Sequence, residues 1–538
     1  MVFKQLWYLH PPSFRQQPED KYARASYASV CKEWQWEWEP ACFNCIVLHQ
    51  DRITEFDKLT TKNSRRRQSV KQIILRVRLG EYDCSVCQHE ESPAEKERNN
   101  LIFTKAVVDL CTILSKWPRR VHKPDQPLIM YGGLSLEIIP FSPSDYHHGF
   151  RDFRLHDDYP IWFITDVLGD EEMIYVTEKE HARETKEKRH NDTTHGWEDG
   201  QNSASLGARQ RITRLLSLGG GVKIPMIRAV TAFSLRRQSY RAVEPSSLHK
   251  LLRAFSNLGS LTHEPWHHVT SAEQGRFQQN YLVLLKRLQT TNKKIKSLVL
   301  FQDSSKMLNP EAPDDGRGWN PNPRRRQLLG ERLTETSRKL DVKILSVAFL
   351  IDAYDFFHEF AVPVPHQVRD PLAWTSLVQV TLTSHRLHPR KIWQDRQDVL
   401  CRAGRAVALM PSLRRLTLWN GGRGFCYAMQ YVRYFRLTKE PQLFLASTSD
   451  EVLSTDLSPQ VLAIWRLVPR NSREPTLVEP KVEYHKVPIP TASIGSFYFT
   501  VTCLRNLPGI VHPVSLHQMI SEERSSCFWQ KDEGQMAA

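Results

Sequence analysis

The sequence predicts an α/β fold: a leucine-rich-repeat-like array of parallel strands and helices, with a short helical segment at the N-terminus. Three observations predict it. Short apolar motifs of one shape recur along the chain, and the segments between them carry apolar residues on one helix face. The composition agrees, because 538 residues of which 40% are hydrophobic can bury a large core. A wholly disordered chain is therefore excluded.

Each strand motif has an apolar residue, a second three positions later and usually a third two positions after that. The period-2 ending is typical of a strand, because alternate side chains share one face. Successive motifs from Ile227 onward begin about 30 to 50 residues apart, which leaves room for a crossover helix between parallel strands. The motifs are Val70-x-x-Ile73-x-Leu75, Ile227-x-x-Val230 ending at Phe233, Leu258-x-x-Leu261, Ile295-x-x-Leu298-x-Leu300, Val342-x-x-Leu345-x-Val347, Leu377-x-x-Val380-x-Leu382 and Leu413-x-x-Leu416-x-Leu418.

Helices are predicted in the gaps between these motifs. Leu248, Leu251, Leu252 and Phe255 fall at i, i+3, i+4 and i+7, and this helix begins at Pro245. Similar apolar stripes occupy Phe103 to Trp117 (ended by Pro118), Tyr281 to Leu288 and Val399 to Met410. Stacked strand–helix units share a continuous core, as in leucine-rich-repeat proteins. An ordinary open α/β sheet is the alternative that the irregular spacing leaves open.

Composition divides the chain into five parts. Residues 1–45 form the short N-terminal segment, 46–177 the first part of the array and 211–520 its C-terminal part. Residues 178–210 contain almost no apolar side chains, so they cannot offset the entropy lost on ordering and are predicted to be a disordered charged linker. Residues 521–538 are polar and are predicted to be a flexible tail.

The charge balance favours contact with nucleic acid or with acidic partners without requiring it. The formal net charge is +15 and the pI is about 9.3. Acidic residues are spread along the chain, so a solvated surface is the simplest interpretation of the basic residues. A nucleic-acid-binding protein without a recognisable base-reading module is the alternative function. The basic runs are short: Arg65-Arg66-Arg67, Arg119-Arg120, Arg236-Arg237 and Arg324-Arg325-Arg326.

Cysteine usage and hydropathy predict a cytoplasmic or nuclear protein, or both. The ten cysteines are mostly far apart, which is unlike a small disulfide scaffold, so free thiols in a reducing compartment are expected. No run approaches the roughly 18 apolar residues that cross a bilayer, so no membrane is expected as a partner. The first ten residues lack the pattern of a secretory signal.

His263-Glu264-Pro265-Trp266-His267 matches the H-E-x-x-H pattern of zinc proteases. In those enzymes the motif lies on a helix, where both histidines bind Zn²⁺ and the glutamate activates water. Here Pro265 lies within the motif, and a proline inside a helix costs about 3 kcal/mol. The motif also follows a predicted strand. We therefore expect a strand-to-loop turn and no metal at this position.

Two C-x-x-C pairs, Cys42-x-x-Cys45 and Cys84-x-x-Cys87, raise the possibility of a four-thiolate zinc site. The first pair begins one predicted strand, and the second lies beyond the end of the next. If those strands are parallel, the pairs lie at opposite ends, about 20 Å apart at roughly 3.3 Å per residue. Free thiols are then expected, whereas an antiparallel pairing would bring the two pairs closer.

No motif of catalysis stands out elsewhere. Asp145, His147 and His148 lie in a polar stretch after Pro143, which is predicted to be a surface turn. No carboxylate pair or Ser/His/Asp set has a recognised spacing. The sequence thus predicts a protein without enzymatic activity, cofactor or metal.

The N-terminal segment contains the sharpest local feature. Tyr27, Val30, Cys31 and Trp34 recur at i, i+3, i+4 and i+7, which predicts one apolar helix face. After them Trp36 and Trp38 alternate with polar residues, so the chain is expected to leave the helix there. The simplest role for such a helix is to pack on the first strand.

The stretch Y-A-S-V-C-K-E-W-Q (27–35) resembles the second half of an F-box, where L-x-x-V-C-x-x-W marks the last helix. Further stretches resemble those of filamentous-fungal F-box-like proteins with a leucine-rich-repeat-like body and a C-terminal domain of unknown function. They are R-N-N-L-I-F-T-K-A (98–106), L-S-L-E-I (134–138), S-P-S-D (142–145), A-V-T-A-F-S-L-R-R-Q (229–238), H-E-P-W (263–266), L-V-L-F-Q-D (298–303), M-P-S-L-R-R-L-T-L-W-N-G (410–421) and H-P-V-S-L-H-Q-M (512–519).

This resemblance implies a protein-interaction scaffold. An F-box docks on a Skp1-type adaptor, and the repeat body presents an unknown protein substrate to a cullin–RING ubiquitin ligase. Tyr27, Val30, Cys31 and Trp34 would then belong to the F-box core or to its adaptor-binding face. Residues 1–26 contain Pro11, Pro12 and Pro18 in place of the usual Leu-Pro helix. Residues 1–45 are accordingly interpreted as a degenerate F-box-like segment.

Overall fold

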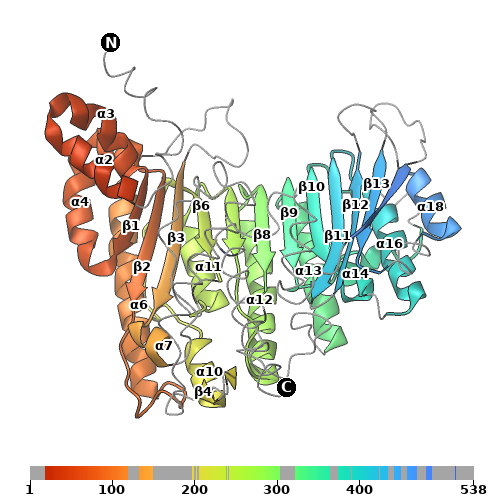
Figure 1. The fold of residues 1–538 in the computed structure, drawn as a ribbon, viewed down its shortest axis with the longest axis horizontal. Coiled ribbons are helices and arrows are strands. Elements are labelled where there is room, and N and C mark those ends of the chain that lie inside the picture. Colours follow the sequence, from red (N-terminus) through yellow and green to blue (C-terminus); the bar gives the residue numbers. More distant parts are fainter. Residues whose placement is uncertain are drawn as a thin grey trace, which may run out of the picture.

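A single twelve-stranded sheet organises the molecule. The computed structural model describes residues 19–118, 133–148, 197–198, 201–202, 205–237, 239, 241–302, 304, 322–363, 373–388, 391–422, 425–433, 441–449, 457–468, 480–487 and 515. Within them the strands lie in the order β1-β2-β3-β6-β7-β8-β9-β10-β11-β12-β13-β14, so neighbours in the sheet follow one another along the chain. Figure 1 shows them side by side, from β1 in red to β13 in blue. The predicted α/β array is confirmed.

Parallel pairing runs without interruption from β1 to β11. The predicted parts 46–177 and 211–520 therefore contribute to one continuous sheet. The first nine strands are β1 (Cys45–His49), β2 (Gln72–Arg78), β3 (Leu134–Phe141), β6 (Val230–Leu235), β7 (Ser260–His263), β8 (Ser297–Phe301), β9 (Ile344–Ala348), β10 (Gln379–Thr383) and β11 (Arg415–Gly422).

The recurring motif of the sequence becomes a ladder of apolar side chains across the sheet. In the predicted strands the second residue of the motif is the register partner of the second residue in the neighbouring strand. Strand β6 is the exception, because Phe233 takes the position expected for Val230. Every member of this row is buried in one hydrophobic core. The row is Ile73, Leu136, Phe233, Leu261, Leu298, Leu345, Val380, Leu416, Tyr431 and Leu443.

The helices between the strands pack on one another in chain order, α11 on α12, α12 on α13, α13 on α14 and α14 on α16. Their starts follow local sequence signals. Ser92 and Thr270 close capping boxes with Glu95 and Glu273, and Pro245 occupies the first turn of its helix. These helices are α6 (Pro93–Ser115), α10 (Leu206–Ile212), α11 (Pro245–Ala254), α12 (Ser271–Thr291), α13 (Pro323–Lys339), α14 (Ala353–Phe356), α16 (Trp393–Val407) and α18 (Pro459–Arg466).

The C-terminal end of the sheet departs from the predicted parallel array. Strand β12 (Phe425–Val432) pairs antiparallel with β11, and β13 (Gln442–Ser447) pairs antiparallel with β12. Only two residues separate β11 from β12, and a parallel partner needs a crossover of about a dozen residues or more. A hairpin is therefore the only possible connection. The last strand, β14 (Lys481–Lys486), is again parallel to β13.

The predicted linker falls largely outside the described residues, as does the predicted tail 521–538. The short strands β4 (Trp197–Glu198) and β5 (Gln201–Asn202) pair antiparallel within the linker range, and α10 begins at Leu206. The last residues of that range are thus helical. Among the helices that the structure describes, none has both the length and the apolar character needed to cross a bilayer.

Candidate functional site

The predicted partner-binding residues do not share one helix. Helix α2 (Glu19–Val30) ends before Cys31, whose backbone is extended, and α3 (Lys32–Phe43) begins immediately after it. The prediction of a single apolar face over residues 27–34 is therefore wrong. The prediction that the chain leaves the helix at Trp36 is also wrong, because α3 continues to Phe43. Residues seven positions apart meet because two helices fold against each other.

This helical pair, the α2–α3 hairpin, divides the four residues into two groups. The Tyr27 ring packs against Trp34 in an edge-on contact at 5.6 Å and against Trp38 at 5.2 Å between centroids, so these rings hold the two helices together. Val30 is 65% exposed, and Cys31 is also exposed. Trp36, on α3, is 67% exposed. Trp36 was not among the partner-binding residues that were predicted from the sequence.

The hairpin packs on helix α5 (Ser64–Ser69) and on β1, the first strand of the sheet. Arg66 forms an ion pair with Glu39 at 2.7 Å, with side chains that are mostly buried. The Arg65 guanidinium lies 3.4 Å from the Trp36 ring centroid, a cation–π contact. Below the hairpin, α4 (Ile53–Thr61) packs on β1 and α6. The hairpin therefore projects from a fixed position (Figure 1).

A second group of polar residues joins β3 to the segments that follow β6 and β7. Four of the stretches that carry the family resemblance converge there. Glu137 of β3 pairs with Arg236, which follows β6, and both side chains are nearly inaccessible to solvent. Ser515 donates a hydrogen bond to the Glu264 carboxylate, which follows β7. Residues 251 positions apart are thereby joined.

Arg237 and Trp266, which follow β6 and β7, form a further contact beside this group. The Arg237 guanidinium lies 4.3 Å from the Trp266 ring centroid, and the Trp266 indole donates to the Arg237 carbonyl at 2.8 Å. Arg236 and Arg237 are both buried, so the prediction of a solvated surface is wrong for this basic run. Burial raises the pKa of Glu137 despite the opposing effect of Arg236. The cluster is an internal joint between strands.

Asp145 belongs to a buried charge cluster and not to the predicted surface turn. It lies in the short helix α7 (Pro143–His148) and accepts hydrogen bonds from Arg241 at 3.0 Å and from the Tyr82 hydroxyl at 2.9 Å. Arg241 also pairs with Glu91, to which Arg214 adds a bond at 2.7 Å. Burial opposes ionisation of Glu91, but the two arginines prevail and lower its pKa.

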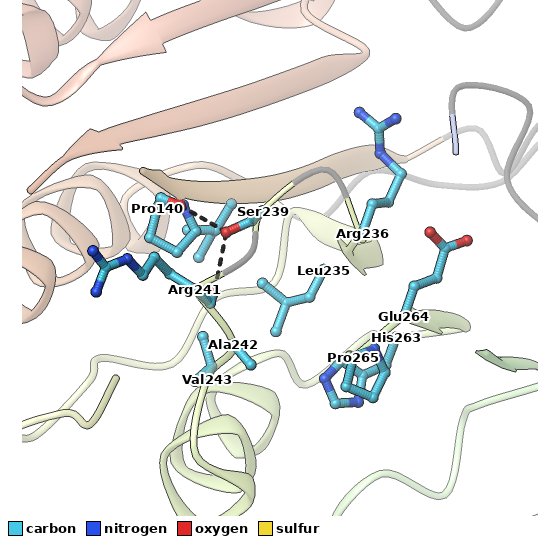
Figure 2. Close-up of a pocket in the computed structure, with 11 residues that line it drawn as sticks. Pro140, Leu235, Arg236, Ser239, Arg241, Ala242, Val243, His263, Glu264 and Pro265 are labelled. Carbon is cyan, nitrogen blue, oxygen red and sulfur yellow. Dashed lines mark hydrogen bonds between the residues drawn. The ribbon is translucent and has the colours of Figure 1, made fainter. Parts of the chain in front are cut away.

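Between these clusters lies a shallow pocket. Figure 2 shows Leu235 at its centre, with the guanidinium groups of Arg236 and Arg241 pointing away on either side. The Ser239 hydroxyl lies within hydrogen-bond distance of the Pro140 and Arg241 carbonyl oxygens, at 2.6 and 3.0 Å. The pocket has room for about one water molecule and is too small for an organic substrate.

The H-E-P-W-H motif forms the predicted strand-to-loop turn. His263 ends β7 and lies in the core between Leu235 and Leu300 of the neighbouring strands. Its Nδ1 is 3.1 Å from the Tyr281 hydroxyl. Burial lowers the pKa of His263 to about 3 and that of His267 to about 4, so both are neutral at neutral pH. His263 takes the place of an aliphatic residue.

The parallel pairing of β1 and β2 settles the arrangement of the cysteine pairs. Cys45 is the register partner of Gln72, at the start of β2, and Cys84 follows the far end of that strand. The two pairs therefore lie at opposite ends of the strands. Among the described residues, no three His, Cys, Asp or Glu side chains are grouped so that they could hold a metal ion.

Another polar cluster, which the sequence analysis missed, follows β9 and β10. Asp352 is fully buried and accepts hydrogen bonds from the Ser384 hydroxyl at 2.6 Å, from the Tyr354 backbone at 2.8 Å and from His385. Burial opposes ionisation, but these donors lower the pKa of Asp352. In a catalytic Asp–His–Ser set the histidine lies between the serine and the aspartate. Here Ser384 and His385 both bind Asp352 directly, so the arrangement differs. The available signal was an aspartate directly after the apolar run that contains β9 and continues to Ile351.

No curated protein matches this chain. The C-terminal domain of unknown function that the resemblance implied is confirmed in part of the chain. Over residues 290–512, from the last turn of α12 to beyond β14, the chain is similar to a family of unknown function, DUF6546.

Proposed function

We propose that this protein is a non-enzymatic interaction scaffold, an F-box-like substrate receptor of a cullin–RING ubiquitin ligase or a relic of one. The α2–α3 hairpin would contact a Skp1-type adaptor, and the repeat-like body would hold an unknown protein substrate. A cytoplasmic or nuclear location, or both, belongs to the same proposal.

The observation that carries the proposal is the exposure of apolar residues on the hairpin. Val30 and Trp36 are each about two-thirds exposed, although aromatic contacts bury other side chains of the same helices. Val30 and Trp36 are therefore accessible for contact with a partner, and tryptophan is among the residues that contribute most to binding at interfaces. The ion pair between Glu39 and Arg66 supports this, because it fixes the hairpin relative to the sheet.

The body of the molecule also favours binding over catalysis. Around β3, β6 and β7 the charged side chains form buried ion pairs, and the pocket between these pairs admits about one water molecule. Charged groups that are paired in this way stabilise the packing of loops on the sheet. A rigid stack of strands and helices then presents its loops to a partner.

The proposal is tested by a pull-down with purified Skp1-type adaptor and cullin. Val30→Asp is expected to remove the adaptor from the eluate, because a charge in an apolar contact is costly. Ile392→Asp is the matched control, because Ile392 is 64% exposed at the start of another helix. The proposal fails if the unaltered protein retains neither adaptor nor cullin, or if both variants bind equally.

The nucleic-acid alternative has less support. Three of the four basic runs contribute an arginine to an ion pair within the fold: Arg66 with Glu39, Arg236 with Glu137 and Arg326 with Asp355. The remaining run, 119–120, lies outside the described residues. Binding whose affinity falls steeply with salt would favour this alternative, since neutralised phosphates release counterions.

A further inference from the structure

The thiol of Cys84 lies beside an imidazole from a different part of the chain. Its Sγ is 3.6 Å from Nδ1 of His148, although 64 positions separate the two residues. Cys84 follows β2, and His148 ends helix α7, which follows β3. Because β2 and β3 are parallel neighbours, their carboxyl ends meet at one edge of the sheet. Cys84 is exposed there.

A second cysteine lies on the same turn. Cys87 is buried, and its Sγ lies 3.3 Å from the Cys84 carbonyl oxygen. The turn is held by Asp83, whose carboxylate accepts from the Ser85 backbone at 2.9 Å. Residues three apart in a turn have Cα atoms within about 7 Å, and a disulfide spans about 4.4–6.8 Å. The backbone of this turn therefore permits a disulfide between Cys84 and Cys87.

Buried contacts fix the position of His148 relative to Cys84. The Tyr82 ring lies 5.4 Å from the His148 ring, and its hydroxyl donates to Asp145. The Tyr82 backbone donates to the Ser144 hydroxyl at 3.0 Å. Tyr82 is two positions before Cys84, and Ser144 and Asp145 belong to the helix of His148. The charge cluster around Arg241 thus holds thiol and imidazole together.

We propose that Cys84 and Cys87 form a redox-active thiol pair in which His148 accepts the proton of the Cys84 thiol. The oxidant is a low-molecular-weight disulfide of the glutathione class. This inference does not depend on the proposed function. Nucleophilic cysteines need a neighbouring base or positive group, because the thiolate is the reactive form.

The reaction consists of two thiol–disulfide exchanges. The Cys84 thiolate attacks one sulfur of oxidised glutathione after its proton has passed to His148, and one glutathione thiolate leaves. The Cys87 thiolate then attacks the Cys84 sulfur of the mixed disulfide and releases the second glutathione thiolate. The two protons lost by the protein are taken up by the two leaving thiolates. Two protein thiols are oxidised, and one disulfide is reduced to two molecules of glutathione.

Alkylation of the full-length protein at neutral pH tests the role of His148. Cys31 is an internal reference, because it is exposed on the α2–α3 hairpin of the same molecule. Peptide mass mapping is expected to show Cys84 reacting with iodoacetamide roughly tenfold faster than Cys31. His148→Gln is expected to bring Cys84 to the rate of Cys31 and to leave Cys31 unchanged. Equal rates in the unaltered protein, or no effect of His148→Gln, would overturn the proposal.

Oxidised glutathione tests the partnership of the two thiols. The unaltered protein is expected to form a Cys84–Cys87 disulfide, and Cys87→Ser to stop at a glutathione adduct on Cys84. Cys84→Ser changes an exposed side chain, so the fold is retained, and Cys87 is expected to stay unmodified because it is buried. A lasting glutathione adduct on Cys84 of the unaltered protein, or stoichiometric zinc protecting both thiols, would contradict a redox pair.

Discussion

The Glu137 carboxylate of β3 and the Arg236 guanidinium, which follows β6, form an ion pair whose side chains are 1% and 2% exposed. The partners are 99 positions apart, and they belong to β3 and to the segment that follows its neighbour β6. Each comes from a stretch on which the family resemblance rests. The relationship shows that charged residues in these stretches join neighbouring strands.

Removing one partner of this pair is expected to destabilise the protein strongly. Glu137→Ala leaves the Arg236 charge buried without its carboxylate, which costs about 3–5 kcal/mol. The double variant Glu137→Leu/Arg236→Met is expected to recover most of that loss, because a buried pair can be replaced by apolar residues of similar size. Urea unfolding measures both. If the double variant is as unstable as Glu137→Ala, the ion pair stabilises the folded protein by more than the mutual neutralisation of its two charges.

The parallel strands and their helices could be predicted because burial follows from apolar periodicity. The second residue of each strand motif, for example Leu298 or Leu345, lies at the same position of the core ladder. The same reasoning failed at residues 27–34. A spacing of seven fits one helix, but it equally fits two helices that break at Cys31 and bring Tyr27 to Trp34. Periodicity alone does not separate these structures.

The polar clusters could not be predicted, because their partners are distant in sequence. Arg241 meets Asp145 from 96 positions away and Glu91 from 150, and each is an ordinary surface residue by type. Glu137 was the exception, since a lone carboxylate within the apolar run of β3 is a signal of a buried pair. The Cys84–His148 contact had no such signal, because it depends on the pairing of β2 with β3.

Stability is expected to fall as the pH drops from about 6.5 toward 5. Burial lowers the pKa of His263 to about 3, whereas an unfolded histidine titrates near 6.5. The unfolded state therefore binds more protons in this range, and the loss approaches about 1.4 kcal/mol per pH unit for each such histidine. Above pH 6.5 this contribution is fully present. Urea unfolding from neutral pH down to about pH 5 measures it.

His263→Leu is expected to reduce the slope of this pH dependence by the share of one histidine, because leucine matches the apolar neighbours Leu235 and Leu300 and does not titrate. His485→Leu is the control, since His485 is exposed. The lowered pKa of Glu95, about 2, matters only below its ordinary range near 4.5, so it does not affect this window. An unchanged slope in His263→Leu would contradict the assignment.

Trp34→Ala is expected to loosen the α2–α3 hairpin without unfolding the sheet. The substitution removes the edge-on contact with Tyr27, and such a contact contributes about 0.5–1.5 kcal/mol beyond the buried area. Hydrogen exchange should rise in residues 19–43 and remain unchanged in β8. Val30→Ala, which alters an exposed side chain, should change neither. Equal exchange in both variants would show that the aromatic contact does not hold the hairpin.

Ser515→Ala is expected to lower the free energy of unfolding by about 1–3 kcal/mol. The serine hydroxyl donates to the Glu264 carboxylate, both residues are buried, and a buried acceptor that loses its donor incurs a desolvation cost. Ser29→Ala is the control, because that hydroxyl bonds an exposed backbone carbonyl and its loss should change stability by no more than about 0.5 kcal/mol. Since Ser515 lies 251 positions from Glu264, a loss confined to Ser515→Ala would show that the stretch H-P-V-S-L-H-Q-M stabilises the carboxyl end of β7. Equal stability of the two variants would show that it does not.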